Sequence, residues 1–208
     1  MKGSFALLGA FAAGAGVMLA ELTAPRALAP VFGAGYRIWV AVVASTMAAM
    51  ALGYWLGERA RPSPRRCACT LVAMGLLALP APFLVKPLGH LFDPVPVPLE
   101  EWTHVDDGFG GALVVLALLF MPMACCAAAV APLAAKVLTG NGLPAGAAAG
   151  RVLAAGTLGS LLGTLAPHGF LLDTFGVRAT LLTAAGLPLV TGLVLLFASN
   201  HSDAGRKA

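Results

Sequence analysis

The stretch MLAELTAPRALAPVFGAGYRIWV, residues 18–40, places two charged residues, Glu21 and Arg26, between long apolar runs. Pro25 stands between them and supplies no backbone N–H for a helix to use. We therefore expect the first apolar helix to end near Ala20 and the chain to turn at Pro25. Arg26 would then fold back toward Glu21 as a charge-assisted pair.

The composition indicates that the apolar runs around this stretch cross a membrane. The chain has 208 residues, of which 59% are hydrophobic and 11% are charged, whereas a soluble domain carries about 25% charged residues. Glycine and proline are abundant, at 25 and 15 residues, as transmembrane helices allow. The sequence therefore predicts an all-α, polytopic integral membrane protein in contact with a lipid bilayer.

The lengths of the apolar runs predict the number of crossings. A membrane-spanning helix needs roughly 20 mostly apolar residues, and six segments have this length. The predicted transmembrane helices cover residues 3–20, 38–56, 67–85, 111–132, 152–172 and 179–198. They form one transmembrane domain, residues 1–200, and residues 201–208 form a cytoplasmic tail. Prolines inside these segments are expected to kink the helices.

The distribution of lysine and arginine predicts the orientation. With the N-terminus inside, most of the 13 Lys and Arg residues lie in cytoplasmic segments: Lys2, Arg59, Arg61, Arg65, Arg66, Lys136, Arg151, Arg206 and Lys207. The others, at or near outer ends, are Arg26, Arg37, Lys86 and Arg178. By the positive-inside rule, we expect a bacterial inner-membrane protein with both termini in the cytoplasm. A cleaved signal peptide also fits the first segment, but it lacks a good A-x-A site, so a retained helix is favoured.

The net charge of +4 follows from this topology. It does not indicate nucleic-acid binding, because no basic patch alternates with aromatic residues. Cys67 and Cys69 have C-x-C spacing, and Cys125 and Cys126 are adjacent, which is neither a disulfide framework nor a zinc-site spacing. We interpret the cysteines as small packing residues in preference to a soft-metal site, and we expect no metal and no cofactor.

One acidic, proline-rich outer loop is predicted at residues 92–110. It contains five acids and no Lys or Arg; the acids are Asp93, Glu100, Glu101, Asp106 and Asp107. A solvated loop is the simplest interpretation. The alternatives are an acidic vestibule that concentrates cations and a weak metal site at His104, Asp106 and Asp107, which lack a firm ligand spacing.

Two recurring patterns suggest that the six helices form two inverted sets of three. Ala24-Pro25 recurs as Ala131-Pro132, and Gly53-x-x-x-Gly57 recurs as Gly159-x-x-x-Gly163. Three-helix units in tandem have opposite topology, as in each half of a major-facilitator transporter; in a chain so rich in Ala and Gly, coincidence is the alternative. Small residues four apart share one helix face, where we expect close helix packing.

The opening stretch, together with ALGYWLGERA at residues 51–60, resembles the membrane domain of the bacterial fused transporter/spermidine synthase family. Three later segments agree with that family: VAPLAAK (130–136), AAGTLGSLLGTLAPHGFLL (154–172) and DTFGVRATLL (173–182). The resemblance implies a six-helix, major-facilitator-like membrane module that associates with a separate spermidine-synthase-like enzyme. Family members commonly continue into a soluble synthase domain, but this sequence has no G-x-G-x-x-G fingerprint, so we do not expect an enzyme.

Charge inside a bilayer is costly and usually faces a bundle interior or a wet cavity. Glu21 and Arg26 either pin the loop between the first two helices or form a site in which Glu21 binds a cation or proton. His168 and Asp173 are expected at the same outer end, beside Arg178, although an ordinary turn also explains Asp173 and Arg178. The predicted substrate-binding residues are Glu21, Arg26, His168 and Asp173.

Three functions fit these observations. The first is a transporter-like module that binds or moves a small, cationic, polyamine-like solute, with a polar cavity between the two helix sets and a homodimer that completes the path. The second is a membrane anchor or scaffold for the synthase-like enzyme, docked on GERARPSPRR, residues 57–66, which anionic lipids would also bind. The third is a structural subunit of a larger membrane complex. Transport is favoured because ionisable residues inside membranes mark functional sites.

Overall fold

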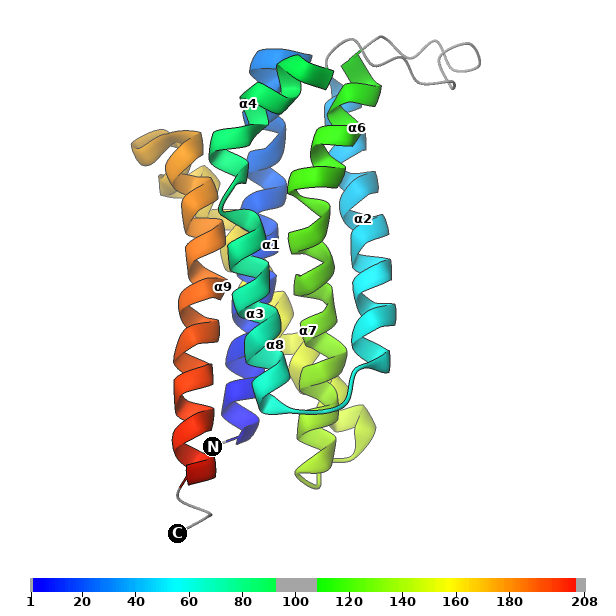
Figure 1. The fold of residues 1–208 in the computed structure, drawn as a ribbon, viewed down its shortest axis with the longest axis vertical. Helices are drawn as coiled ribbons and strands as arrows, with labels where there is room; N and C mark the ends of the chain where they lie inside the picture. The colour runs from blue at the N-terminus through cyan, green and yellow to red at the C-terminus, as the bar shows by residue number, and fades with distance from the viewer. Residues whose placement is uncertain (1, 93–107, 205–208) are drawn as a thin grey trace.

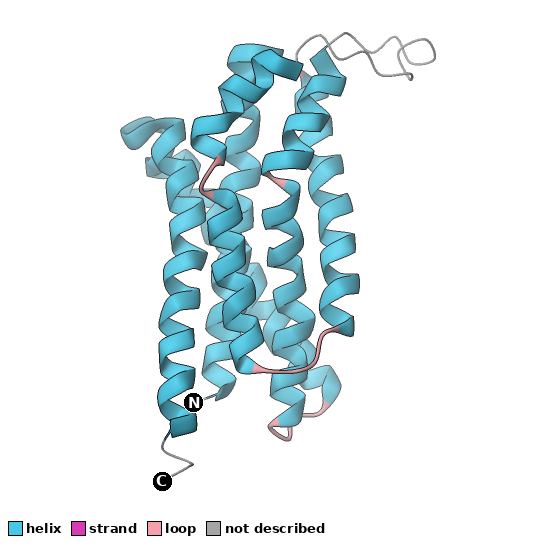
Figure 2. Ribbon diagram, in the orientation of Figure 1, coloured by secondary structure: helices cyan, strands magenta, loops and turns pink. Residues whose placement is uncertain are grey.

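The computed structural model describes residues 2–92 and 108–204, in which helices are joined by short turns and loops and no strand occurs (Figure 2). The described helices are α1 (Lys2–Phe32), α2 (Tyr36–Arg59), α3 (Pro64–Ala78), α4 (Ala81–Phe92), α6 (Gly108–Leu119), α7 (Met121–Gly140), α8 (Ala145–Ala166), the π-helical turn η1 (Pro167–Leu171) and α9 (Leu172–Ala204). The all-α prediction is confirmed for this part of the chain. The vestibule and metal-site predictions for residues 93–107 fall outside the described residues.

Helix α1 is the centre of the bundle and contacts every other described helix (Figure 1). Its most extensive contact is with α8, while α2 pairs with α7 and α3 pairs with α9. The buried core is rich in alanine, and larger buried side chains such as Leu28, Met74 and Met123 fill the space between the helices. α1 begins and α9 ends at the same end of the bundle (Figure 1).

The predicted turn at Pro25 is wrong, because α1 continues past Ala20 and ends at Phe32. Pro25 lies inside the helix, and the neighbouring Ala24 is fully buried. Burial among several helices outweighs the hydrogen bond that proline removes, as transmembrane bundles allow. The chain reverses at Gly33, which has a φ of 82°.

The third and fourth predicted helices are each broken in two. Residues 67–85 fall on α3 and α4, which bend by 50° at a turn that contains Pro80. Residues 111–132 fall on α6 and α7, and Pro122 stands in the first turn of α7, where a missing N–H costs no helical hydrogen bond. The sequence pattern predicted kinks, and the structure has complete interruptions in the helices.

Four helical stretches are long and apolar enough to cross a membrane: Gly3–Phe32, Tyr36–Arg59, Met121–Gly140 and Ala145–Ser199. The bent pair of α3 and α4 makes five if it counts as one crossing. These helices support the predicted class of membrane protein. The predicted number of six crossings requires the single stretch Ala145–Ser199 to cross twice, once as α8 and once as α9.

Glycines four residues apart bring two helix pairs into close contact. A Cβ atom on Gly159 of α8 would lie 2.8 Å from the carbonyl carbon of Phe11 in α1 and closer still to its oxygen. A Cβ atom on Gly53 of α2 would lie 3.0 Å from the carbonyl carbon of Cys125 in α7. Real Cβ atoms essentially never approach other heavy atoms closer than 3.0 Å, so the predicted packing role of these glycines is confirmed.

Lys136 of α7 binds the C-terminal end of α2. Its Nζ donates hydrogen bonds to the carbonyl oxygens of Glu58 and, at 3.1 Å, of Ala60. A cation at a helix C-terminus compensates the unpaired carbonyls and the helix dipole. The positive-inside rule explained Lys136 as a general anchor, and the structure gives it this specific contact as well.

We expect Lys136→Met to lower the free energy of unfolding by about 1–2 kcal/mol, because the end of α2 loses a charged donor. Unfolding by sodium dodecyl sulfate in mixed micelles measures the change. Arg151→Met is the matched control: Arg151 is exposed on α8, and its replacement should stay within about 0.5 kcal/mol of wild type. Equal stability of the two variants would contradict a capping role.

Candidate functional site

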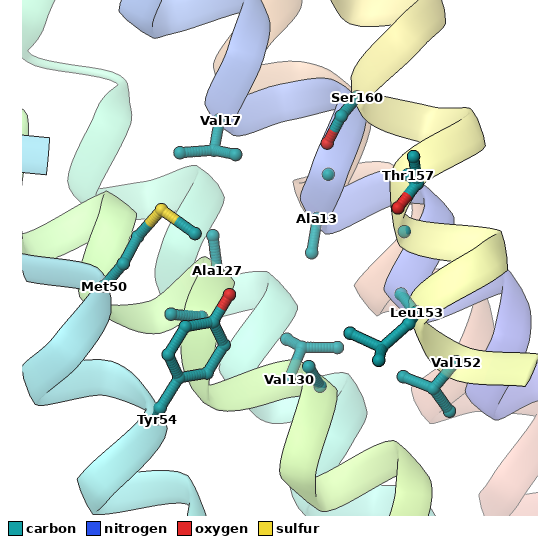
Figure 3. Close-up of a pocket in the computed structure, with 15 residues that line it drawn as sticks. Ala13, Val17, Met50, Tyr54, Ala127, Val130, Val152, Leu153, Thr157 and Ser160 are labelled. Atoms are coloured by element: carbon teal, nitrogen blue, oxygen red, sulfur yellow. The ribbon is translucent and has the colours of Figure 1, made fainter. Parts of the chain in front are cut away.

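A cleft of about 140 Å³ lies between α1, α2, α7 and α8 (Figure 3). Its floor consists of small buried residues of α1 and α7, such as Ala13 and Ala127. Exposed residues of α2 and α8 form its sides, among them Tyr54 and Leu153, which are 43% and 61% exposed. We call this space the central cleft.

Three hydroxyl groups form the polar part of the central cleft. Tyr54 extends from α2 on one side, and Thr157 and Ser160 lie on α8 at the other (Figure 3). Thr157 and Ser160 are three residues apart, which places them on the same helix face. Gly14 of α1 leaves room for the Ser160 side chain, since a Cβ atom on Gly14 would be 2.9 Å from the Ser160 hydroxyl oxygen. The cleft can therefore offer hydrogen bonds to a small molecule held against apolar walls.

None of these hydroxyl residues was among the predicted site residues. They carry no charge, so a search for ionisable residues inside apolar runs passes over them. The available signal was indirect: Tyr54 lies in ALGYWLGERA and Thr157 and Ser160 lie in AAGTLGSLLGTLAPHGFLL, two of the segments on which the family resemblance rests.

Glu21 lies in a separate, smaller cavity next to the central cleft. This cavity, of about 10 Å³, is also lined by Thr46 of α2, Phe120 and Met123, and its volume is close to that needed for one water molecule. Val17 lines both spaces, so the two spaces adjoin each other at this residue of α1. Pro25 has no N–H, and the main-chain carbonyl of Glu21 therefore lacks its usual helical donor. Glu21 thus contributes acceptor oxygens near the cleft.

Arg26 does not pair with Glu21, and the described residues contain no ion pair between them. Residues five apart on a continuous α-helix are separated by about 140° around its axis. The unbroken α1 therefore directs the two side chains to different faces, which removes the basis of the predicted loop-pinning pair. Arg26 is exposed and lines another pocket, between α1, α4 and α9.

His168 and Asp173 are exposed residues of η1 and the start of α9. Neither lines the central cleft or the cavity of Glu21, so the structure does not bring together the four predicted site residues. Within residues 2–92 and 108–204, no three His, Cys, Asp or Glu side chains form a group that would hold a metal ion. The substrate-binding roles of His168, Asp173 and Arg26 stay predictions.

The central cleft offers both hydrogen-bonding groups and apolar surface to a small molecule. Its three hydroxyls donate and accept hydrogen bonds, and no charged side chain lines it. Glu21 lines the adjoining cavity, which shares Val17 with the cleft. Comparison of the chain with protein-family models, curated proteins and solved structures finds no match. The resemblance to the transporter/spermidine synthase family is therefore an expectation that rests on its motifs.

Proposed function

We propose that this chain is a six-crossing membrane protein that binds and moves a small solute through the central cleft. The observation that carries the proposal is the cleft itself, in which Tyr54 faces Thr157 and Ser160 across an apolar floor (Figure 3). Its volume of about 140 Å³ resembles that of cavities that hold a molecule of benzene's size. A few polar groups in an apolar site fix the orientation of a bound molecule.

The pairing of helices supports six crossings in two inverted sets. Ala145–Ser199 contains 55 residues, more than twice the roughly 20 that one crossing needs, and its helical path is interrupted at Gly176. The main pairs are α1 with α8, α2 with α7 and α3 with α9. If α1 corresponds to α7, α2 to α8 and α3 to α9, exchanging each helix for its counterpart gives the same three pairs. A two-fold relation between inverted repeats requires this symmetry. The cleft then lies between the sets.

The presence of Glu21 near the cleft favours a cationic solute. We propose that this solute is a small amine of the polyamine-like class. Glu21 lines the cavity that adjoins the cleft at Val17, and its carboxylate would attract a positive charge held away from water. The ring of Tyr54 adds a π face that favours cations. A proton on Glu21 would weaken this attraction, so protonation of Glu21 could be coupled to release of the solute.

A second copy of the chain completes the proposed path. In one copy the hydroxyl-bearing residues Tyr54 and Thr157 are exposed, and exposed polar groups are unfavourable against lipid. Exposed leucines flank them on α8, including Leu153 and Leu161. A homodimer formed through α2 and α8 would cover these residues and enclose the cleft.

We expect a small amine such as putrescine to stabilise the purified protein in thermal-shift titrations, and Glu21→Gln to weaken its binding about tenfold, or 1.4 kcal/mol. Thr157→Leu should abolish binding by filling the cleft. Thr183→Leu is the matched control, because Thr183 is exposed on α9 and bonds only its own helix, at Ala179. Light scattering on the same samples reports whether the binding species is a dimer.

The proposal is contradicted if no amine stabilises the wild type, or if Thr157→Leu binds as well as Thr183→Leu. A second function then becomes preferred, the membrane anchor or scaffold for a spermidine-synthase-like enzyme. It is favoured by four exposed arginines near the α2–α3 connection, Arg59, Arg61, Arg65 and Arg66. Copurification of such an enzyme with the chain would support it.

A further inference from the structure

We propose that the pocket between α1, α4 and α9 binds an amphipathic organic anion, a phosphate or carboxylate group attached to an apolar chain. The pocket has a volume of about 530 Å³ and is lined by three cations, Arg26, Lys86 and Arg178. We call it the basic pocket. It shares no lining residue with the central cleft, so this site is additional to the proposed solute path.

The three cations reach the basic pocket from three different helices. Arg26 belongs to α1, Lys86 to α4 and Arg178 to α9, and these helices pack against one another (Figure 1). No Asp or Glu lines the pocket, and the described residues give these three cations no ion pair. Like charges brought together repel one another, and an anion held among them would remove that repulsion.

Arg178 is held in position at the wall of the basic pocket. Its Nε donates a hydrogen bond to the carbonyl oxygen of Pro82 at 3.4 Å, and its guanidinium carbon lies 5.6 Å from the centre of the Phe83 ring. A guanidinium group can bind phosphate or carboxylate through two parallel hydrogen bonds. Fixing the group beforehand lowers the entropy lost on binding.

The remaining walls of the basic pocket are apolar, which argues against a simple inorganic ion. Val85 and Leu181 are buried, whereas Phe83 and Phe175 are 54% and 55% exposed. An apolar chain would cover these surfaces while its charged end meets the cations. Basic pockets between membrane helices are known to bind anionic lipid headgroups on the cytoplasmic side, and the same charge chemistry is available in this pocket.

The side of the membrane on which the three cations of the basic pocket are predicted to lie is a further argument for a bound anion. In the orientation predicted from the sequence, Arg26, Lys86 and Arg178 lie on the outer side, where Lys and Arg are disfavoured by the positive-inside rule. The helices place them at the end of the bundle away from the start of α1 (Figure 1). An anion bound among them would explain three cations on the disfavoured side. The anion can belong to a membrane lipid or to a free amphipathic solute.

The test is a thermal-shift titration of the purified full chain in neutral detergent with octyl phosphate, octanol and inorganic phosphate. We expect octyl phosphate to stabilise the protein, octanol to have no comparable effect, and inorganic phosphate to bind at least tenfold more weakly. Arg26→Gln and Lys86→Gln should each weaken octyl phosphate binding at least tenfold. Arg151→Gln, on α8 outside the pocket, should bind like the wild type.

Native mass spectrometry with phosphatidylglycerol or phosphatidylcholine then distinguishes the sources of the anion. Retention of phosphatidylglycerol, displaced by octyl phosphate, identifies a lipid headgroup; octyl phosphate binding without lipid retention identifies a free organic anion. The proposal is overturned if octanol stabilises as much as octyl phosphate, or if folded Lys86→Gln and Arg26→Gln bind like the wild type. Neither result bears on amine binding at the central cleft.

Discussion

Gly159→Ala is expected to separate α8 from α1 and to destabilise the bundle strongly. The added Cβ atom would lie 2.8 Å from the carbonyl carbon and 3.0 Å from the Cα atom of Phe11. These are backbone atoms, so no side-chain rotation relieves the overlap, and the two helices must move apart along their most extensive contact. We expect a loss of unfolding free energy at or above the roughly 1–3 kcal/mol typical of overpacking.

Equilibrium unfolding in mixed micelles measures this loss, and the same helix offers the control. A Cβ atom on Gly150 would have no heavy atom within 4 Å. Gly150→Ala should therefore be neutral or stabilising by about 0.5–1 kcal/mol, because alanine favours helix more than glycine does. If the Gly159→Ala and Gly150→Ala variants unfold at the same detergent fraction, the close contact between Gly159 and the backbone of Phe11 is contradicted.

Gly176→Ala is expected to destabilise the connection of α8 to α9 by about 1–3 kcal/mol, through backbone strain alone. Gly176 has φ of 77° and ψ of 177°, a region that is essentially restricted to glycine. No heavy atom lies within 4 Å of a Cβ atom at this position, so a steric clash with neighbours cannot account for the effect. Alanine would favour a straight helix where the chain now bends.

Gly169→Ala separates this strain from the general cost of a methyl group. Gly169 also has open space around a Cβ atom, and its φ is not positive. The Gly169→Ala variant should unfold like the wild type in the same assay, while Gly176→Ala unfolds earlier. Coincident unfolding curves for the two variants would show that α9 does not need a residue with positive φ at position 176.

The class of the protein and its tightest contacts could be predicted because both depend on local patterns. Apolar runs and low charge indicate membrane helices whatever their partners are. The four-residue spacing of Gly159 and Gly163 likewise defines a helix face before any fold is known. The end of α1 could not be predicted in this way. A proline in the interior of an isolated helix usually ends or kinks it, but the helices packed around Pro25 allow α1 to continue.

The candidate sites were less accessible to sequence analysis. Glu21 stood out because a carboxylate in an apolar run is rare, and its cavity beside the central cleft fits that signal. Tyr54 had no comparable signal, since its hydroxyl is unremarkable in sequence. The basic pocket joins residues from distant parts of the chain, including Arg26 and Arg178, and only their positions in the fold show that their charges share one space.

The contact between α1 and α8 also bears on how the protein is made. α1 is synthesised before α8, which begins at Ala145, 113 residues after α1 ends at Phe32 (145 − 32). At typical translation rates this interval lasts roughly 6–23 s. Throughout it, the face of α1 that accepts Gly159 has no partner from its own chain and must be shielded by lipid or by the insertion machinery. α1 therefore reaches its final surroundings only after α8 has been made.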